Sequence, residues 1–164
     1  MLKHFVAALF VVGSAAVPAA AQDAGEIARA QQGKDCRNCN LFQADLSYLD
    51  LPGINLSGSR LRQADLSLAT MNHANLSGVN LSVADLFGAR LTAADLSNAD
   101  LQNASLVGAY LGSANLAGAK LSGANLGGAE LGTAKGLTQA QLNTACGDRS
   151  TVLAAGLQIP ACRP

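Results

Sequence analysis

The stretch ANLAGAKLSGANLGGAEL, residues 114–131, places a leucine at every fifth position. An α-helix turns by about 100° per residue, so these leucines would spiral around its surface instead of forming one stripe. A straight strand alternates its faces with a period of two, so an odd spacing sends successive leucines to opposite sides. A backbone that bends once in five residues keeps all of them inside, and the spacing predicts such a backbone.

The five-residue register is long and unbroken. Nineteen repeats cover residues 39–133, with centre positions that run from Leu41 to Leu131 and include Met71 as the one centre that is not leucine. Two places before the centre, alanine stands in fourteen of nineteen repeats, and the exceptions are Cys39, Leu49, Ile54, Ser59 and Val79. One place before the centre, Asp or Asn stands in twelve of nineteen. Low-complexity sequence would not keep three positions in phase over this length, so the chain is a true repeat.

The pattern A-(D/N)-L-x-x over residues 39–133 resembles that of the pentapeptide-repeat family. The resemblance implies an all-β fold, a right-handed quadrilateral β-helix with four pentapeptides per coil, in which the centre leucine and the alanine before it point inward. Nineteen repeats then form a little under five coils, a rod on the order of 23 Å tall. The turn at Pro52-Gly53 suits a corner of such a coil, because glycine tolerates a positive φ.

Residues 1–21 have the anatomy of a secretory signal peptide. A short basic start at Lys3 precedes an uncharged run from Phe5 to Ala21, which ends in three small residues. We expect cleavage between Ala21 and Gln22 and a mature protein that is periplasmic or secreted. The 17 uncharged residues are fewer than the roughly 20 apolar residues of a spanning helix, so we expect no membrane span in the mature form.

The segments that flank the repeats are expected to cover the ends of the rod, since each coil buries its leucines only against its neighbours. Residues 22–38 form a lead-in that contains the first cysteine of a C-x-x-C pair, and we expect it to be flexible, with no more than a weak helical turn over 24–32. In residues 134–164, Thr138 and Gln141 have the spacing of a capping box. They predict a short capping helix over about 139–145, with Gly147 beyond its end, and a tail over 148–164 without regular structure.

The four cysteines lie as two pairs at opposite ends of the repeats, Cys36 with Cys39 and Cys146 with Cys162. A zinc site needs four ligands together, and a disulfide spans less than about 7 Å between Cα atoms. We therefore expect two local structural disulfides, 36–39 and 146–162, formed after export. The alternative is a thiol–disulfide redox protein that uses the C-x-x-C pair, whose thiols would then have a lowered pKa.

The outward positions offer little for catalysis. His73 is the only histidine after the signal peptide, and its counterparts one coil away, Gly53 and Ala93, could not orient its ring. A catalytic triad or a histidine metal site lacks partners here, so the sequence predicts no catalytic residue, no metal and no cofactor.

Two polar columns are expected along the rod if every fourth repeat shares a face. Asp45, Asp65 and Asp85 form a candidate acidic ladder, which could bind a cation or raise the pKa of its own members. On another face, a second column predicts amide side chains that bond to one another along the rod; its members are Asn55, Asn75, Asp95 and Asn115.

The outward positions also contain an oblique apolar stripe, which we name by its members Tyr48, Leu68, Phe87 and Val107. The surrounding positions are mostly Ser, Gly, Asn and Thr. Contiguous exposed apolar patches mark partner sites, so the stripe is a candidate surface for a partner protein or for a homodimer. The alternative is a set of scattered corner residues that the lead-in or the tail covers.

The net charge of the chain limits the functions that it can have. Without residues 1–21, the chain contains ten Lys and Arg and eleven Asp and Glu. Such a nearly neutral chain has no long-range electrostatic field that would attract nucleic acid. Some relatives of the quinolone-resistance type resemble DNA and bind type II topoisomerases, but that role requires a strongly acidic cytosolic rod. The repeats here contain seven acidic and four basic residues. We therefore expect an exported, non-enzymatic scaffold or binding module with an envelope or extracellular partner.

Overall fold

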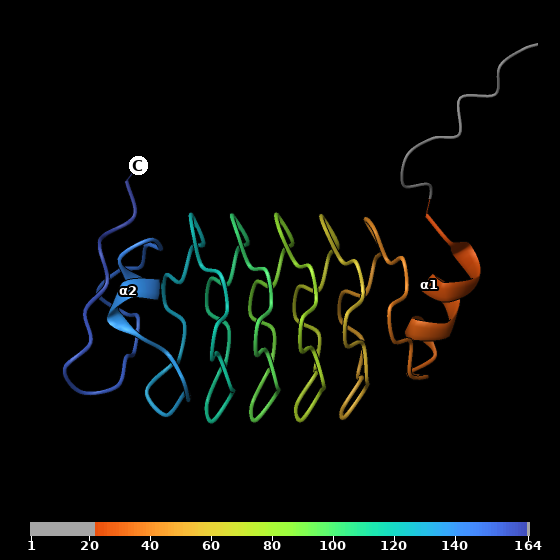
Figure 1. Cartoon of the computed structure of the whole chain (residues 1–164), viewed down its shortest axis with the longest axis horizontal. Coiled ribbons are helices and arrows are strands. Elements are labelled where there is room, and N and C mark those ends of the chain that lie inside the picture. Colours follow the sequence, from red (N-terminus) through yellow and green to blue (C-terminus); the bar gives the residue numbers. More distant parts are fainter. Residues whose placement is uncertain (1–21, 164) are drawn as a thin grey trace, which may run out of the picture.

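A computed structural model describes residues 22–163 as a rod of stacked coils with a helix at each end (Figure 1). Helix α1, Ala24–Gln31, lies at the start of the rod, and helix α2, Gln139–Leu142, lies at its other end. The predicted signal peptide, 1–21, lies outside the described residues. Within 22–163, no helix has the length and apolar character needed to cross a membrane.

The coils stack through parallel bridges between residues twenty positions apart. Examples are Asp65 with Asp85 and Ser105 with Asn125, so four pentapeptides make one coil, as the resemblance implies. The residues before the centres lie on four faces of the rod. We use two of them below, the Asp45 face (45, 65, 85, 105, 125) and the Asp50 face (50, 70, 90, 110, 130).

The core consists of the centre leucines and the small residues two places before them. Leu96 and Ala94 are fully buried examples, and burying one leucine contributes roughly 1.5–3 kcal/mol. Leu49 departs from the pattern, because it is only partly buried and packs against the core from its edge. Apart from Leu49, the inward residue types stand where the register predicts them.

Most corners are tight turns in which the centre carbonyl accepts a hydrogen bond from the N–H three residues later, as from Ala44 to Leu41 at 3.1 Å. In nearly all corners the second residue has a positive φ whether it is glycine or not: 62° at Gly78 and 61° at the exposed His73. This is the geometry of a type II turn. Side chains other than glycine lose roughly 1–2 kcal/mol in adopting it.

The lead-in differs from the flexible segment that we expected. It forms α1, whose first turn is capped by Asp23: its Oδ1 accepts from the N–H groups of Gly25 and Glu26, both at 3.0 Å. Ala30 is fully buried against the first coil. The prediction was wrong because the helix packs through a small residue and leaves only Ile27 as a large apolar signal.

The C-terminal cover confirms the capping box and corrects the structure expected after it. Thr138 Oγ1 accepts from Gln141 N, and Gln141 Oε1 accepts from Thr138 N at 2.8 Å. The helix ends at Leu142, earlier than predicted, because the chain returns to the coil ladder and Cys146 pairs with Asn125. Gly147 is therefore not a helix terminator but pairs with Ala161. The tail is likewise not irregular throughout, since Val152 pairs with Glu130.

Candidate functional site

The apolar stripe lies on one corner of the rod, between the Asp45 face and the Asp50 face. We call it the Tyr48 corner; it comprises residues 47–48, 67–68, 87–88, 107–108 and 127–128. Neighbouring coils meet directly there: Tyr48 N donates to Ser67 O at 2.9 Å, and Leu68 N donates to Phe87 O at 2.8 Å. The stripe is therefore contiguous from coil to coil.

The stripe is exposed rather than covered by the lead-in or the tail. Tyr48 is 74% exposed, Leu68 43% and Phe87 49%, whereas Val107 is half-buried. Three further exposed apolar residues, Val83, Tyr110 and Val152, lie outside this corner. The stripe is thus the place where large apolar side chains gather on successive coils of the described rod.

Tyr110 extends the patch, and sequence reasoning missed it. It lies on the Asp50 face in the same coil as Val107, is 40% exposed, and its ring centroid lies 5.6 Å from the guanidinium carbon of Arg90. An aromatic residue in a position that usually holds Asp or Asn was the available signal. Between Val107 and Tyr110 lies Gly108, and a Cβ added there would meet no atom within 4 Å. Bare backbone therefore separates the two side chains.

The acidic ladder stacks as predicted, but its chemistry differs. Asp45, Asp65 and Asp85 lie on successive coils and are exposed. Each Oδ1 accepts from the N–H two residues later, at 3.0, 2.9 and 2.9 Å respectively. Hydrogen bonds from the Ser47 hydroxyl and N–H lower the pKa of Asp45, so the expected mutual rise is wrong for this member.

The same local bond explains most of the expected amide column. Asn55 Oδ1 and Asn75 Oδ1 accept from the N–H two residues later, both at 3.1 Å. Along the rod, Asn115 Nδ2 donates to Asp95 Oδ1 at 3.1 Å. Within residues 22–163, no group of three His, Cys, Asp or Glu side chains is placed to hold a metal ion.

Both expected disulfides are present, Cys36–Cys39 and Cys146–Cys162. Cys36 occupies a centre position, five residues before Leu41, and its N–H donates to Asn55 O at 2.8 Å. The register therefore begins one repeat earlier than predicted, and twenty centres make five full coils. The two cysteines replace the leucine at the centre of this repeat and the small residue two places before the next centre.

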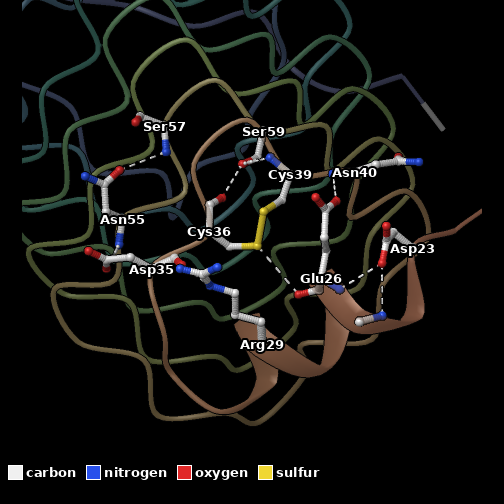
Figure 2. Close-up of a disulfide and its surroundings, with 11 residues drawn as sticks. Asp23, Glu26, Arg29, Asp35, Cys36, Cys39, Asn40, Asn55, Ser57 and Ser59 are labelled. Carbon is white, nitrogen blue, oxygen red and sulfur yellow. Dashed lines mark hydrogen bonds between the residues drawn. A yellow bond between two sulfur atoms is a disulfide. The ribbon is translucent and has the colours of Figure 1, made fainter.

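Ser59 ties the first disulfide to the next coil (Figure 2). Its buried hydroxyl donates to Cys36 O at 2.7 Å and accepts from Cys39 N at 3.0 Å. In most other repeats, these two backbone groups bond directly across the corner. The serine therefore stands in an alanine position because it bridges a corner that the disulfide holds open.

Helix α1 caps the open edge beside this disulfide (Figure 2). Glu26 Oε2 accepts from Asn40 N at 2.6 Å, and Asp35 Oδ1 accepts from Asn55 N at 3.0 Å. A polar cavity of about 480 Å³ lies here, lined by Glu26, Arg29, Asp35, Cys36, Arg37 and Cys39. Cys36 is only 1% exposed and Cys39 6%, and thiol–disulfide exchange needs access to a sulfur. This burial does not favour the redox alternative.

The comparisons with known proteins agree on one repeat type. The model of the family described as pentapeptide repeats matches residues 32–58, 54–92, 64–102 and 94–132, in eight copies. A comparison with curated proteins finds no match.

Several solved structures are similar. One is HetL, a pentapeptide repeat protein involved in heterocyst differentiation regulation from the cyanobacterium Nostoc sp.: identity is 30%, coverage is 78% of this chain and 61% of HetL, and the TM-score is 0.42. A pentapeptide repeat protein from the Arabidopsis thaliana thylakoid lumen is 30% identical over 55% of this chain and 52% of its own, with a TM-score of 0.32. The plasmid-mediated fluoroquinolone resistance protein QnrB1 is 20% identical over 76% of each chain, with a TM-score of 0.42. The chain thus spans less than two thirds of the first two proteins.

Proposed function

This chain belongs to the pentapeptide-repeat family, and from that premise we propose that it is an exported, non-enzymatic scaffold whose Tyr48 corner binds another protein. The observation that carries the proposal is the contiguous exposed stripe of Tyr48, Leu68 and Phe87. A partner that covers these apolar side chains removes them from water, which contributes roughly 25 cal/mol of binding free energy per Å² of apolar area buried.

Backbone conformation supports the same interpretation. Tyr48 has a φ of 60° and Leu68 a φ of 58°, while Gly88 and Gly108 occupy the same corner position in later coils. Glycine is thus compatible with this position and avoids the cost of a left-handed side chain. Gln63 and His73 share this conformation at other corners, and what sets Tyr48 and Leu68 apart is that both are also large, apolar and exposed on successive coils.

Export is part of the proposal. It is supported by the signal-peptide pattern of residues 1–21 and by the two disulfides, which persist in oxidising compartments such as the periplasm or the exterior. The nearly neutral charge favours neither nucleic-acid binding nor the topoisomerase-binding role.

Export is tested by intact mass. Protein recovered from its native host without reducing agent should lack residues 1–21 and four hydrogens, and it should resist alkylation. A full-length mass with four free thiols would place the protein in a reducing compartment and revive the cytosolic role. Cleaved protein with only Cys36 and Cys39 alkylated would instead support the redox alternative.

Binding is tested by site-specific cross-linking in the native host. A photoreactive amino acid at position 48 should give a discrete cross-linked protein, and the same amino acid at position 98, an exposed corner position between the two faces that do not border the Tyr48 corner, is the control. Phe87→Ser should abolish the product from position 48. Equal cross-linking from both positions, or a product insensitive to Phe87→Ser, would show that the Tyr48 corner is not the binding surface.

A further inference from the structure

We infer that the partner of the Tyr48 corner is an amphipathic α-helix with basic residues along one flank, lying parallel to the rod axis. The inference rests on the proposed binding role of this corner and names the class of partner that fits it. Three features carry it: the spacing of the stripe, the capped edges of the rod, and the column of carboxylates on one side.

Spacing favours a helix over an extended segment. The stripe crosses four successive coils from Tyr48 to Val107, which at about 4.8 Å per coil is about 14 Å. A helix presents one face at every third or fourth residue, or about every 5 Å, so ten residues cover about 15 Å in register with the coils. An extended strand presents the same side every 6.8 Å or so and would fall out of register.

Strand addition also lacks a free edge at the capped positions of this rod. Backbone groups at the first coil bond to Glu26 and Asp35. At the last coil, Gln141 Nε2 donates to Leu116 O and Ala119 O, both at 2.9 Å. Partners that pair through main-chain hydrogen bonds need such an edge, whereas a helix needs only side chains.

The charged residues on the two sides of the stripe determine which flank of the partner helix is basic. Asp45, Asp65 and Asp85 run beside the stripe on the Asp45 face, and local hydrogen bonds fix each Oδ1. The Asp50 face on the other side is mixed, with an exposed acid, Asp50, in the first coil and an exposed base, Arg90, in the third. A helix with Lys or Arg along one flank therefore complements one side only, which sets its orientation.

The backbone permits close approach. Gly88 and Gly108 stand where side chains would otherwise separate Phe87 and Val107 from Arg90 and Tyr110. The space above Gly108 is open, and the Leu68 side chain lies over Gly88. A helix lying over Gly108 contacts the stripe on one side and Tyr110 on the other.

The test uses the purified mature protein and three labelled peptides of about 18 residues. The first has leucines at helical spacing and lysines on one flank, the second has glutamates in place of the lysines, and the third is the lysine peptide with a central proline, which breaks a helix. Fluorescence anisotropy should show binding of the first peptide only, weakening as salt screens the charges.

Matched variants separate the two parts of the surface. Asp65→Asn with Asp85→Asn keeps an oxygen at Oδ1 for the local hydrogen bonds and removes two charges; it should weaken binding about fivefold and flatten the salt dependence. The control, Asp95→Asn with Asp100→Asn, removes two charges from other faces and should leave affinity unchanged. Phe87→Ser should weaken binding on the order of tenfold or more.

Each contrary result has a distinct meaning. Binding of no peptide, equal binding of the glutamate or proline peptide, or full affinity in Asp65→Asn with Asp85→Asn overturns the basic helix as partner. The proposed function survives these results if cross-linking from position 48 remains sensitive to Phe87→Ser. Lysine-peptide binding that ignores Phe87→Ser overturns both. A dimer in sedimentation that Phe87→Ser dissociates identifies a second copy as the partner and also overturns the inference.

Discussion

In the middle coils, backbone groups pair with the same five-residue unit one coil away, whereas at the ends some of them pair with side chains instead. Leu66 N donates to Asp85 O at 2.7 Å, and the same bond recurs from Leu86 N to Ser105 O at 2.7 Å. At the start of the rod, the partner of Asn40 N is the Glu26 carboxylate. A middle coil is thus stabilised from two sides by other coils, and an end coil from one.

The two disulfides lie where the coils have fewer neighbouring coils. Both disulfides lie at the ends, Cys36–Cys39 in the first corner and Cys146–Cys162 where the tail meets the ladder. In a solenoid, each repeat is stabilised by its interfaces with its neighbours, so an end repeat with one interface needs another source of stability. Four predictions test whether the middle depends on burial and the ends on links and caps.

The largest effect is expected for Leu96→Asp in a middle coil. Leu96 is fully buried, and an unpaired carboxylate there costs more than about 4 kcal/mol, enough to unfold the rod. Thermal unfolding followed by circular dichroism measures this loss, with Ser97→Asp on the adjacent outward position as the control. A folded Leu96→Asp protein would mean that the five-residue register is misassigned.

A smaller and more local effect is expected for Cys146→Ser with Cys162→Ser. The disulfide closes a loop of sequence separation 16, for which the chain-entropy estimate is about 3 kcal/mol. Amide hydrogen exchange should show lost protection around Gly147 and Val152, while the middle coils keep theirs. Equal loss of protection along the whole rod would show that the ends and the middle unfold as one unit.

A third prediction replaces the first corner with a middle one, through Cys36→Leu, Cys39→Ala and Ser59→Ala together. Loss of the short disulfide loop costs about 2 kcal/mol, but leucine buries more apolar area and the direct corner hydrogen bond can form. We expect a net change in unfolding free energy of about 1 kcal/mol or less. Chemical denaturation measures it, with Cys36→Ser and Cys39→Ser as the control that leaves polar groups buried.

The result also bears on the redox alternative. A triple variant that is stable and keeps its cross-link from position 48 supports a structural role for the disulfide. A stable variant that has lost its cellular role would show that the sulfurs themselves are needed.

The middle of the rod was predictable because every position repeats. A single residue that departs from the pattern, such as Met71 or Ser59, could not shift a register that eighteen other repeats support. The capping box was predictable for another reason: Thr138 and Gln141 interact locally, three residues apart. Cys36 as a centre could also have been found, since it lies five residues before Leu41.

The remaining end features depend on contacts far apart in the sequence. Helix α1 is stabilised where Glu26 reaches Asn40, fourteen residues later, and no periodic pattern signals that contact. The early end of α2 follows from the pairing of Cys146 with Asn125, a tertiary contact that overrides helix propensity. Exposure of the stripe likewise depended on where α1 and the tail lie, which the sequence left open.

The smallest expected effect concerns an Asp-x-Ser arrangement that occurs both in the C-terminal cap and on the Asp45 face. In Asp148-Arg149-Ser150, as in Asp45-Leu46-Ser47, the serine hydroxyl donates to the aspartate Oδ1 at 2.6 Å. These serine bonds are the main reason that the pKa of both aspartates lies below the ordinary value of 3.8. Since the lowered pKa belongs to the folded state, the stabilisation that each aspartate gives the fold is complete above the ordinary pKa and is lost as the pH falls through the folded pKa.

Ser150→Ala should therefore raise the pKa of Asp148 and leave that of Asp45 unchanged in an NMR titration of the carboxyl carbons. If Asp148 does not respond, the cap only resembles a repeat corner in shape, and its lowered pKa must come from its other hydrogen bonds, with the N–H groups of residue 150 and Gly128 and with the Thr151 hydroxyl.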